Sequence, residues 1–133
     1  MKYEDLTREI IRACYVVSND LGSGFVESVY HRALNVALEE RGLLAQSSVP
    51  LEVRFHNHVV GEFVADMIVN GSVLLELKAV TALRPEHQAQ VINYLNATGV
   101  EVGLLVNFGR PKPEVRRCTR GTNGTRWATA QIV

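Results

Sequence analysis

The sequence predicts a layered α/β domain in which a mixed β-sheet is flanked by helices. Three observations support this prediction. Two amphipathic helical stretches open the chain, alternating strands with tight turns follow, and a helix between two strands comes late in the sequence. A strand, a helix and a further strand in this order form a right-handed crossover. The expected order is α-α-β-β-β-α-β, with room for one last strand.

The composition is that of a globular protein of modest size. The 133 residues suffice for one core, and 47% apolar with 21% charged residues excludes an intrinsically disordered chain. No apolar run approaches the roughly 20 residues of a membrane helix, and residues 1–10 lack the apolar centre of a secretion signal. Cys14 and Cys118 have no metal-ligand spacing, so we expect free thiols and a cytoplasmic location.

The first 41 residues predict two helices, over residues 4–20 and 25–41. The glycines of "LGSGF" separate them, and Gly42 follows the second as a helix stop. Both stretches carry an apolar stripe at helical spacing. The stripes consist of Leu6, Ile10, Ala13, Cys14, Val17 and Leu21, and of Val26, Val29, Tyr30, Ala33, Leu34, Ala37 and Leu38.

The middle of the chain alternates apolar and polar residues, as half-buried strands do. Strands are expected over residues 50–55, 60–69 and 73–79, with turns at 56–58 and 70–72. Each strand has one apolar face. That face holds Leu51, Val53 and Phe55 on the first strand, and Phe63, Ala65, Met67 and Val69 on the second.

A helix over residues 84–99 and an apolar strand over 100–108 complete the expected core, and residues 113–120 are interpreted as an edge strand. Residues 1–120 are therefore predicted to form a single domain. Residues 121–133 lack periodicity, and we interpret them as a C-terminal tail for which flexibility is the expectation.

The register of the second hairpin follows from its apolar faces. They match only if Val69 lies opposite Val73, which requires a three-residue connection with Gly71 or Ser72 at positive φ. A two-residue Asn-Gly turn would mismatch the two faces. The predicted register therefore contains the longer turn.

This register brings charged side chains together on a strand that otherwise looks buried. Asp66 faces Glu76, and Lys78 lies diagonally across from Asp66. Two carboxylates at this distance repel each other, so we expect a cation between them, either Lys78 or a divalent metal ion. An exposed polar sheet face is the simpler interpretation, but three aliphatic residues share that face.

Three motifs in this region resemble those of a known nuclease family. Asp66, nine further residues and then Glu76-Leu77-Lys78 are similar to the D…(D/E)xK signature of the PD-(D/E)xK nuclease superfamily. The proline of the superfamily name is absent, since Ala65 precedes Asp66. "GFVESVY", from Gly24 to Tyr30, matches the motif of the small bacterial GxxExxY protein family. "QVINY", from Gln90 to Tyr94, resembles the QxxxY helix motif of recombination exonucleases.

The resemblance implies a restriction-endonuclease-like fold and metal-dependent hydrolysis of phosphodiester bonds, with DNA as the expected substrate and Mg²⁺ or Mn²⁺ as the cofactor. By this resemblance Asp66, Glu76 and the main-chain carbonyl of Leu77 bind the metal. Glu27 is an added ligand, direct or through water, and Lys78 orients the attacking water or stabilises the phosphate.

Four further residues receive roles from the resemblance. Gln90 and Tyr94 share a helix face, where they contact substrate phosphate or brace the catalytic pair, and Gln90 is counted with the catalytic residues. Tyr30 and Gly24 are assigned to substrate binding, with Gly24 permitting close backbone approach. Both tyrosines also suit the alternative role of core aromatics.

Two other interpretations remain open. The fold can serve as a non-catalytic or weakly active module that binds nucleic acid or a protein partner, because residues 1–106 hold 8 basic against 13 acidic residues and would repel a duplex. Residues 107–133 hold 6 basic against 1 acidic residue, which is either a polyanion-steering end or a solvated surface. A homodimer pairing two sites is the third possibility, and no membrane partner is expected.

Overall fold

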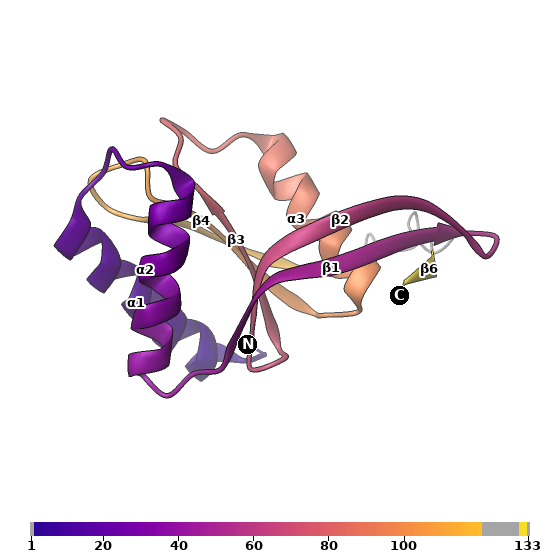
Figure 1. Cartoon of the computed structure of the whole chain (residues 1–133), viewed down its shortest axis with the longest axis horizontal. Coiled ribbons are helices and arrows are strands. Elements are labelled where there is room, and N and C mark those ends of the chain that lie inside the picture. Colours follow the sequence, from indigo (N-terminus) through magenta and orange to yellow (C-terminus); the bar gives the residue numbers. More distant parts are fainter. Residues whose placement is uncertain (1, 121–130, 133) are drawn as a thin grey trace.

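The computed structural model describes residues 2–120 and 131–132, and in it helices cover both faces of one β-sheet (Figure 1). Within these residues the strands pair in the order β5-β4-β3-β2-β1-β6. The pair β3 and β4 is parallel and the other neighbours are antiparallel, so the predicted mixed α/β fold and its element order are confirmed. The elements are α1 (Glu4–Leu21), α2 (Glu27–Glu40), β1 (Ala45–Phe55), β2 (His58–Val69), β3 (Val73–Lys78), α3 (Pro85–Thr98), β4 (Val102–Asn107), β5 (Glu114–Thr119) and β6 (Gln131–Ile132).

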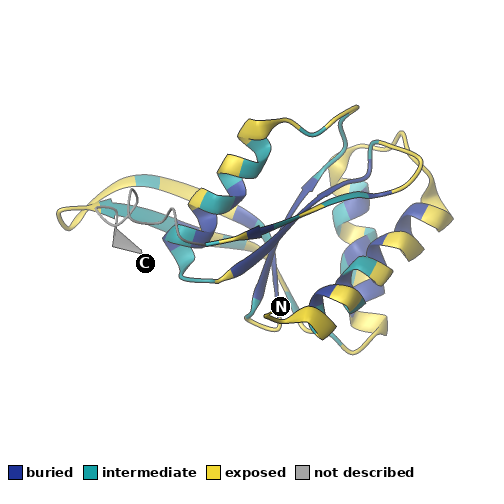
Figure 2. Cartoon of the chain, turned by 180° about the vertical axis from the view of Figure 1, so that it is seen from behind, coloured by how far each residue is buried: buried dark blue, intermediate teal, exposed yellow. Residues whose placement is uncertain are grey.

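Each face of the sheet has its own hydrophobic core. On one face α1 and α2 pack against the strands, as Leu34 and Leu75 do within one cluster. On the other face α3 packs against them, with Leu95 and Leu74 in the second cluster. The central strands β3 and β4 are covered on both faces, which explains their nearly continuous apolar sequence. Figure 2 shows the buried residues concentrated at this centre.

Strand β1 begins five residues earlier than predicted, at Ala45. Three of its added residues, Gln46, Ser47 and Ser48, are polar and exposed, so this stretch lacks the alternation by which we identified the other strands. They form a strand because they pair with β2, Ala45 with Val69 and Ser47 with Met67. Along most of its length β1 has β2 as its only partner in the described residues, and an edge strand accepts solvated polar side chains.

The predicted apolar face of β2 is wrong at Ala65, because the strand changes there which of its side chains point to which side of the sheet. Met67 packs in the core beneath α1 and α2, whereas Ala65 packs in the core beneath α3. On β1, Ala45 and Val49 divide between the two cores in the same way. Ser48, which lies between them, has a positive φ of 53°, an irregularity that lets the strand turn its faces over.

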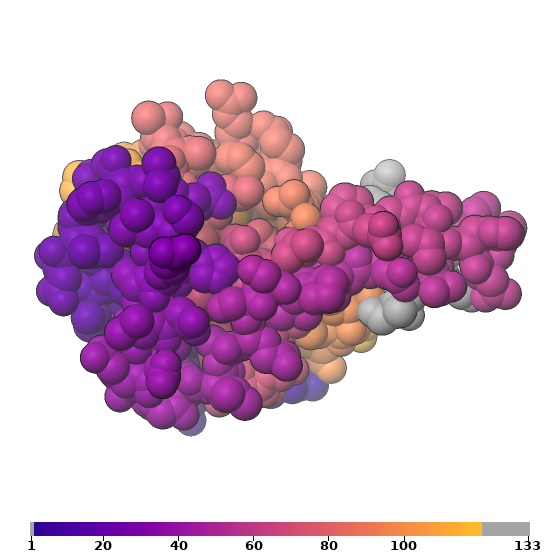
Figure 3. Space-filling model, in the orientation of Figure 1, coloured from indigo at the N-terminus to yellow at the C-terminus, as the bar shows by residue number. Residues whose placement is uncertain are grey.

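Beyond this change the hairpin continues as an arm, defined here as residues 49–65. Figure 3 shows the arm projecting from the body of the molecule. Several of its apolar side chains remain accessible to solvent, including Phe55 at 46% and Phe63 at 44% exposure. The arm therefore offers apolar surface that the two cores do not use.

The predicted hairpin register is confirmed. Val69 pairs with Val73 across a three-residue connection. Gly71 has the expected positive φ of 64°, and Asn70 also adopts one, at 51°, which the prediction did not include. Asparagine tolerates this conformation, and the Asn70 side chain in turn accepts a hydrogen bond from the Leu44 N–H at 2.8 Å.

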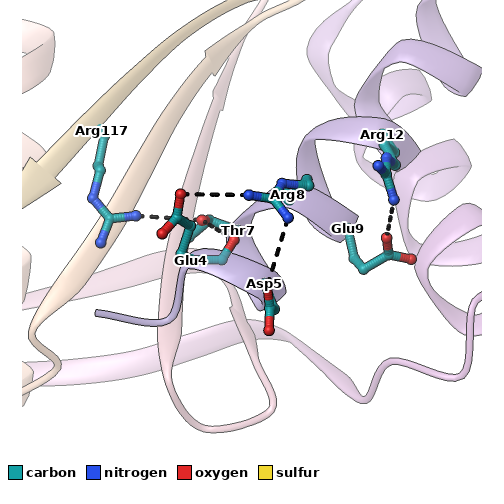
Figure 4. A network of polar contacts seen from close by, with 7 residues as sticks. All are labelled: Glu4, Asp5, Thr7, Arg8, Glu9, Arg12 and Arg117. Atoms are coloured by element: carbon teal, nitrogen blue, oxygen red, sulfur yellow. Dashed lines mark hydrogen bonds and ion pairs between the residues drawn. The ribbon is translucent and has the colours of Figure 1, made fainter. Parts of the chain in front are cut away.

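A polar network joins the start of α1 to strand β5 (Figure 4). Arg117 donates to the Thr7 hydroxyl at 3.3 Å and to the carbonyl of Lys2, and Arg8 pairs with two acidic residues of α1. Arg116 pairs with a glutamate on its own strand. Of the two arginines on β5, only Arg117 joins separate elements of the described part of the fold, and steering of a polyanion by the basic segment 107–133 stays a prediction.

The predicted tail, residues 121–133, lies outside the described residues except for β6. Its two residues pair with Val53 and Arg54 near the end of β1. None of the described helices has the length and apolar character needed to cross a membrane. Cys14 and Cys118 are buried free thiols.

Candidate active site

The site forms where strands β2 and β3 separate. Their backbone pairing stops at Met67 and Leu75, one residue before Asp66 and Glu76. Beyond this point the two carboxylates accept hydrogen bonds from backbone N–H groups. The Asp66 N–H donates to Glu76 Oε1 at 3.2 Å, and the Leu77 N–H donates to Asp66 Oδ2 at 2.7 Å. The structure therefore brings the two predicted acids together rather than placing them on opposite sides of the sheet.

Glu76 is the buried member of this pair, with only 4% of its surface exposed. Burial, together with the charge of Asp66, raises its pKa to about 8, and the nearby Lys78 opposes the shift. One lysine thus does not compensate two carboxylates in this position. A site with this excess of negative charge favours an additional cation.

The oxygen atoms at this point fit a hard divalent cation. The two carboxylates are adjacent, and the Leu77 carbonyl points to the same side, because the N–H and C=O of one strand residue face the same neighbouring strand. Carboxylate and carbonyl oxygens are ligands that Mg²⁺ and Mn²⁺ prefer. Asp66, Glu76 and Leu77 would hold such an ion.

Glu27 lies near this pair but is not part of it. Partial burial raises its pKa, the charge of Lys78 lowers it and that of Asp66 raises it, so its carboxylate is within electrostatic reach of both. Yet no three histidine, cysteine or acidic side chains among residues 2–120 are grouped closely enough to hold a metal ion. The arrangement suits a contact through water better than direct ligation.

Gln90 and Tyr94 lie behind the carboxylate pair on α3. The Gln90 amide donates to the Tyr94 hydroxyl at 3.2 Å. Burial raises the pKa of Tyr94, and the charges of Glu76 and Asp66 raise it further. Tyr94 is therefore within electrostatic reach of the acids and largely buried, and Gln90 is bonded to it.

Tyr30 is placed differently from its predicted substrate-binding role. Its side chain is fully buried and stacks on Phe108, with ring centroids 4.9 Å apart. Its hydroxyl donates to the Gly22 carbonyl at 2.6 Å and accepts from the Phe25 N–H at 3.2 Å. Tyr30 thus braces the loop that precedes Glu27, which is the alternative role that the sequence left open.

Gly24 is required for its backbone conformation, and its predicted part in substrate binding stays a prediction. Its φ is 114°, a region that other residues rarely adopt. A β-carbon at this position would meet nothing within 4 Å in the structure. The glycine allows the loop to turn directly before helix α2, so that Glu27 begins the helix on the side of the carboxylates.

We expect Tyr30→Phe to lower the free energy of unfolding by about 1–2 kcal/mol, because the Gly22 carbonyl and the Phe25 N–H both lose their partner. Urea denaturation followed by circular dichroism measures this loss. Tyr15→Phe, at a half-exposed position of α1, is the control. An unchanged midpoint for Tyr30→Phe would show that the loop does not depend on this hydroxyl.

Two residues near the site were missed by the sequence analysis. Asn107 ends β4 beside Lys78 and is fully buried. Its amide binds the backbone of Val80 and Gly109 and so fixes the chain that follows Lys78. His87, in the first turn of α3, acts electrostatically on Glu27. In the sequence, the only indication of a role for Asn107 was its place as a polar residue at the end of the apolar run "VGLLVN". No sequence feature indicated a role for His87.

Comparison with known proteins agrees with this geometry. The family model of the PD-(D/E)XK nuclease superfamily matches residues 4–118. A search of curated proteins found no significant match. The crystal structure of SSO0001 is similar in fold, with a TM-score of 0.58 and 22% sequence identity over 94% of this chain, which spans 63% of that chain. The match of the family model over most of the sequence shows that the chain belongs to the PD-(D/E)XK nuclease superfamily.

Proposed function

We propose that residues 1–120 form a metal-dependent nuclease domain that hydrolyses phosphodiester bonds in DNA, using Mg²⁺ or Mn²⁺. The observation that carries this proposal is the hydrogen-bonded pair of Asp66 and Glu76, with Glu76 buried and Lys78 two residues along the strand. Superfamily membership supports nuclease chemistry, and the motif from Gly24 to Tyr30 supports placement in the GxxExxY branch.

Each residue of the site has a role in this proposal. Asp66, Glu76 and the Leu77 carbonyl hold the metal ion, which when bound neutralises charge on the phosphate and lowers the pKa of a water. Lys78 orients the attacking water or donates to a phosphate oxygen. Glu27 acts through a water molecule, on the side of Lys78 and Asp66.

The Gln90–Tyr94 hydrogen bond holds two donors close to the carboxylate pair. In the proposed mechanism Gln90 contacts the substrate phosphate, and Tyr94 keeps Gln90 in place because it is itself largely buried. Tyr30 acts at a distance from the reaction, by holding the loop before Glu27. The domain would thus divide its side chains between metal binding, phosphate contact and positioning.

Cleavage of labelled DNA in Mg²⁺, Mn²⁺ or EDTA tests the proposal. We expect wild-type activity with either metal and none in EDTA. Lys78→Ala should lose activity by about 10²-fold, because it removes one charged donor from the reacting centre. Lys2→Ala, which breaks an exposed ion pair with Glu101, is the matched control. Equal activity of the wild type and Lys78→Ala would refute the assignment.

A non-catalytic binding module is the second candidate function. The absence of a three-carboxylate group among residues 2–120 favours it, because it leaves the described ligand set small. This alternative predicts that DNA binds in EDTA and that no divalent metal supports cleavage. The same samples, tested for binding and for cleavage, separate the two functions.

A further inference from the structure

A groove of about 610 Å³ lies between the arm and helix α3. Its volume falls within the usual range of ligand pockets, roughly 300–1,000 Å³. Gln90 and Tyr94 line the groove, and the charges of Glu76 and Asp66 act on Tyr94, so this wall of the groove lies close to the candidate active site. Other described lining residues are Val53, Val60 and Phe63 from the arm and Asn93 from α3.

The groove offers an aromatic face. Phe63 lines it with 44% of its surface exposed, and its ring centroid lies 5.7 Å from that of the largely buried Tyr94. Its exposed ring adjoins other apolar residues of the arm that line the same groove, Val53 and Val60. Exposed aromatic rings beside a nucleic-acid site are platforms on which unpaired bases stack.

The groove also offers amide groups that have capacity for further hydrogen bonds. The side-chain nitrogen of Asn96 is buried and has no acceptor in the described part of the chain. Asn93, one turn away on the same helix, is exposed. Amide side chains pair with the edges of bases, which supply both donors and acceptors.

The charge of the residues that line the groove favours contact with bases over contact with phosphates. Glu86 is the charged side chain among the described lining residues, and none of them is basic. A carboxylate repels phosphate, so the described lining offers no cationic partner to the sugar-phosphate backbone of a duplex. Bases hidden inside a duplex cannot reach the aromatic ring or the amides, whereas those of a single strand can.

We propose that this groove binds the unpaired bases of a single DNA strand and so delivers a single-stranded segment to the carboxylate site. The proposal rests on the proposed nuclease function, because the groove is taken as an extension of that site. Phe63 stacks on a base, the amides of α3 bind base edges, and the phosphate that follows lies at Asp66, Glu76 and Lys78.

Fluorescence anisotropy in EDTA tests the groove without cleavage. The probes are a labelled single-stranded DNA of about 12 nucleotides and the duplex of the same sequence. We expect the single strand to bind more tightly than the duplex. Phe63→Ala should weaken single-strand binding about tenfold, and Phe63→Trp should retain it. Phe55→Ala is the matched control, because Phe55 is equally exposed on the arm and lies outside the groove.

A second readout detects stacking itself. A 2-aminopurine base in the single strand should lose fluorescence on binding to the wild type and keep it with Phe63→Ala. Equal affinity of the wild type and Phe63→Ala, or a duplex that binds as tightly as the single strand, would overturn the proposal. So would a Phe63→Ala effect that sedimentation traces to loss of a dimer, since the groove would then hold a second copy.

The outcomes for the groove and for catalysis are distinguishable. If DNA is cleaved in Mn²⁺ while Phe63→Ala binds normally, the groove proposal fails and the nuclease proposal stands. If binding depends on Phe63 while no metal supports cleavage, the nuclease proposal fails and the groove stands as the site of a binding module.

Discussion

Glu76→Gln is expected to abolish DNA cleavage and, at the same time, to make the metal-free protein more stable at alkaline pH. Cleavage should fall by about 10³-fold, because glutamine keeps the shape of the side chain but removes one of the two carboxylates that would hold the metal. Stability should rise because the wild-type side chain is buried beside Asp66, where a second negative charge is costly.

The direction of the pH effect follows from the pKa of Glu76. Burial and the Asp66 charge raise it from 4.5 in the unfolded chain to about 8 in the folded one. Between these two values the folded protein binds a proton that the unfolded chain has lost, so stability falls as pH rises through this window. The loss in EDTA is on the order of a few kcal/mol. In Glu76→Gln this contribution to the pH dependence is absent.

Thermal unfolding in EDTA across this pH window measures the difference. The wild-type midpoint should decline toward alkaline pH, and the Glu76→Gln midpoint should decline less. Mg²⁺ should raise the wild-type midpoint most at alkaline pH and leave the variant unchanged. Glu39→Gln, at an exposed position on α2, controls for the loss of one negative charge. A Glu76→Gln protein that is less stable than the wild type at alkaline pH would mean that the carboxylate is stabilised by partners other than a metal.

The sequence predicted the carboxylate pair because a period of two and a hairpin register are enough to place two strand residues opposite each other. Val69 opposite Val73 puts Asp66 opposite Glu76 by counting alone. The same reasoning failed for Ala65, since it assumed that alternation continues through Asp66. The irregularity at Ser48 is a backbone feature with no side-chain pattern, so the change of faces and the arm could not be predicted.

The roles of buried polar residues were also beyond the sequence. Tyr30 belongs to a motif and also lies on an apolar helical stripe, and only its contacts with Gly22 and Phe25 decide between the two roles. Asn107 depends on Val80, 27 residues earlier in the chain, and such a pairing becomes visible only when β3 and β4 lie side by side. Local periodicity contains no information about contacts of this kind.

Asn107→Ala is expected to be the most destabilising of the substitutions considered. The Asn107 carbonyl oxygen accepts from the Val80 N–H at 2.9 Å and from the Gly109 N–H at 3.0 Å, and its amide donates to the Val80 carbonyl at 2.9 Å. Alanine leaves all three backbone groups without this partner in a partly buried position. The free energy of unfolding should fall by about 3–5 kcal/mol, a large part of the total for a domain of this size.

The same substitution should also reduce cleavage, because these bonds fix the chain directly after Lys78. The Lys78 carbonyl accepts from the Phe108 N–H at 2.8 Å, and Val80 is held two residues later by Asn107, so β3 and β4 are joined at the end where the proposed catalytic side chains lie. A role in positioning predicts that kcat falls while KM changes little at a temperature where the variant is folded. Asn107→Asp keeps the acceptor for both N–H groups but should recover only part of the stability, because its second oxygen replaces the donor that faces the Val80 carbonyl and Glu114.

Urea denaturation gives the stability difference, and steady-state cleavage in Mn²⁺ below the unfolding transition gives kcat and KM. Asn35→Ala, which removes the same side chain from helix α2, is the control for loss of an asparagine. If Asn107→Ala loses stability but keeps its full kcat, the end of β3 is held without Asn107, and the residue serves only the fold. If kcat falls in Asn107→Ala and returns in Asn107→Asp, the bonds to the Val80 and Gly109 N–H groups are what keep Lys78 in place.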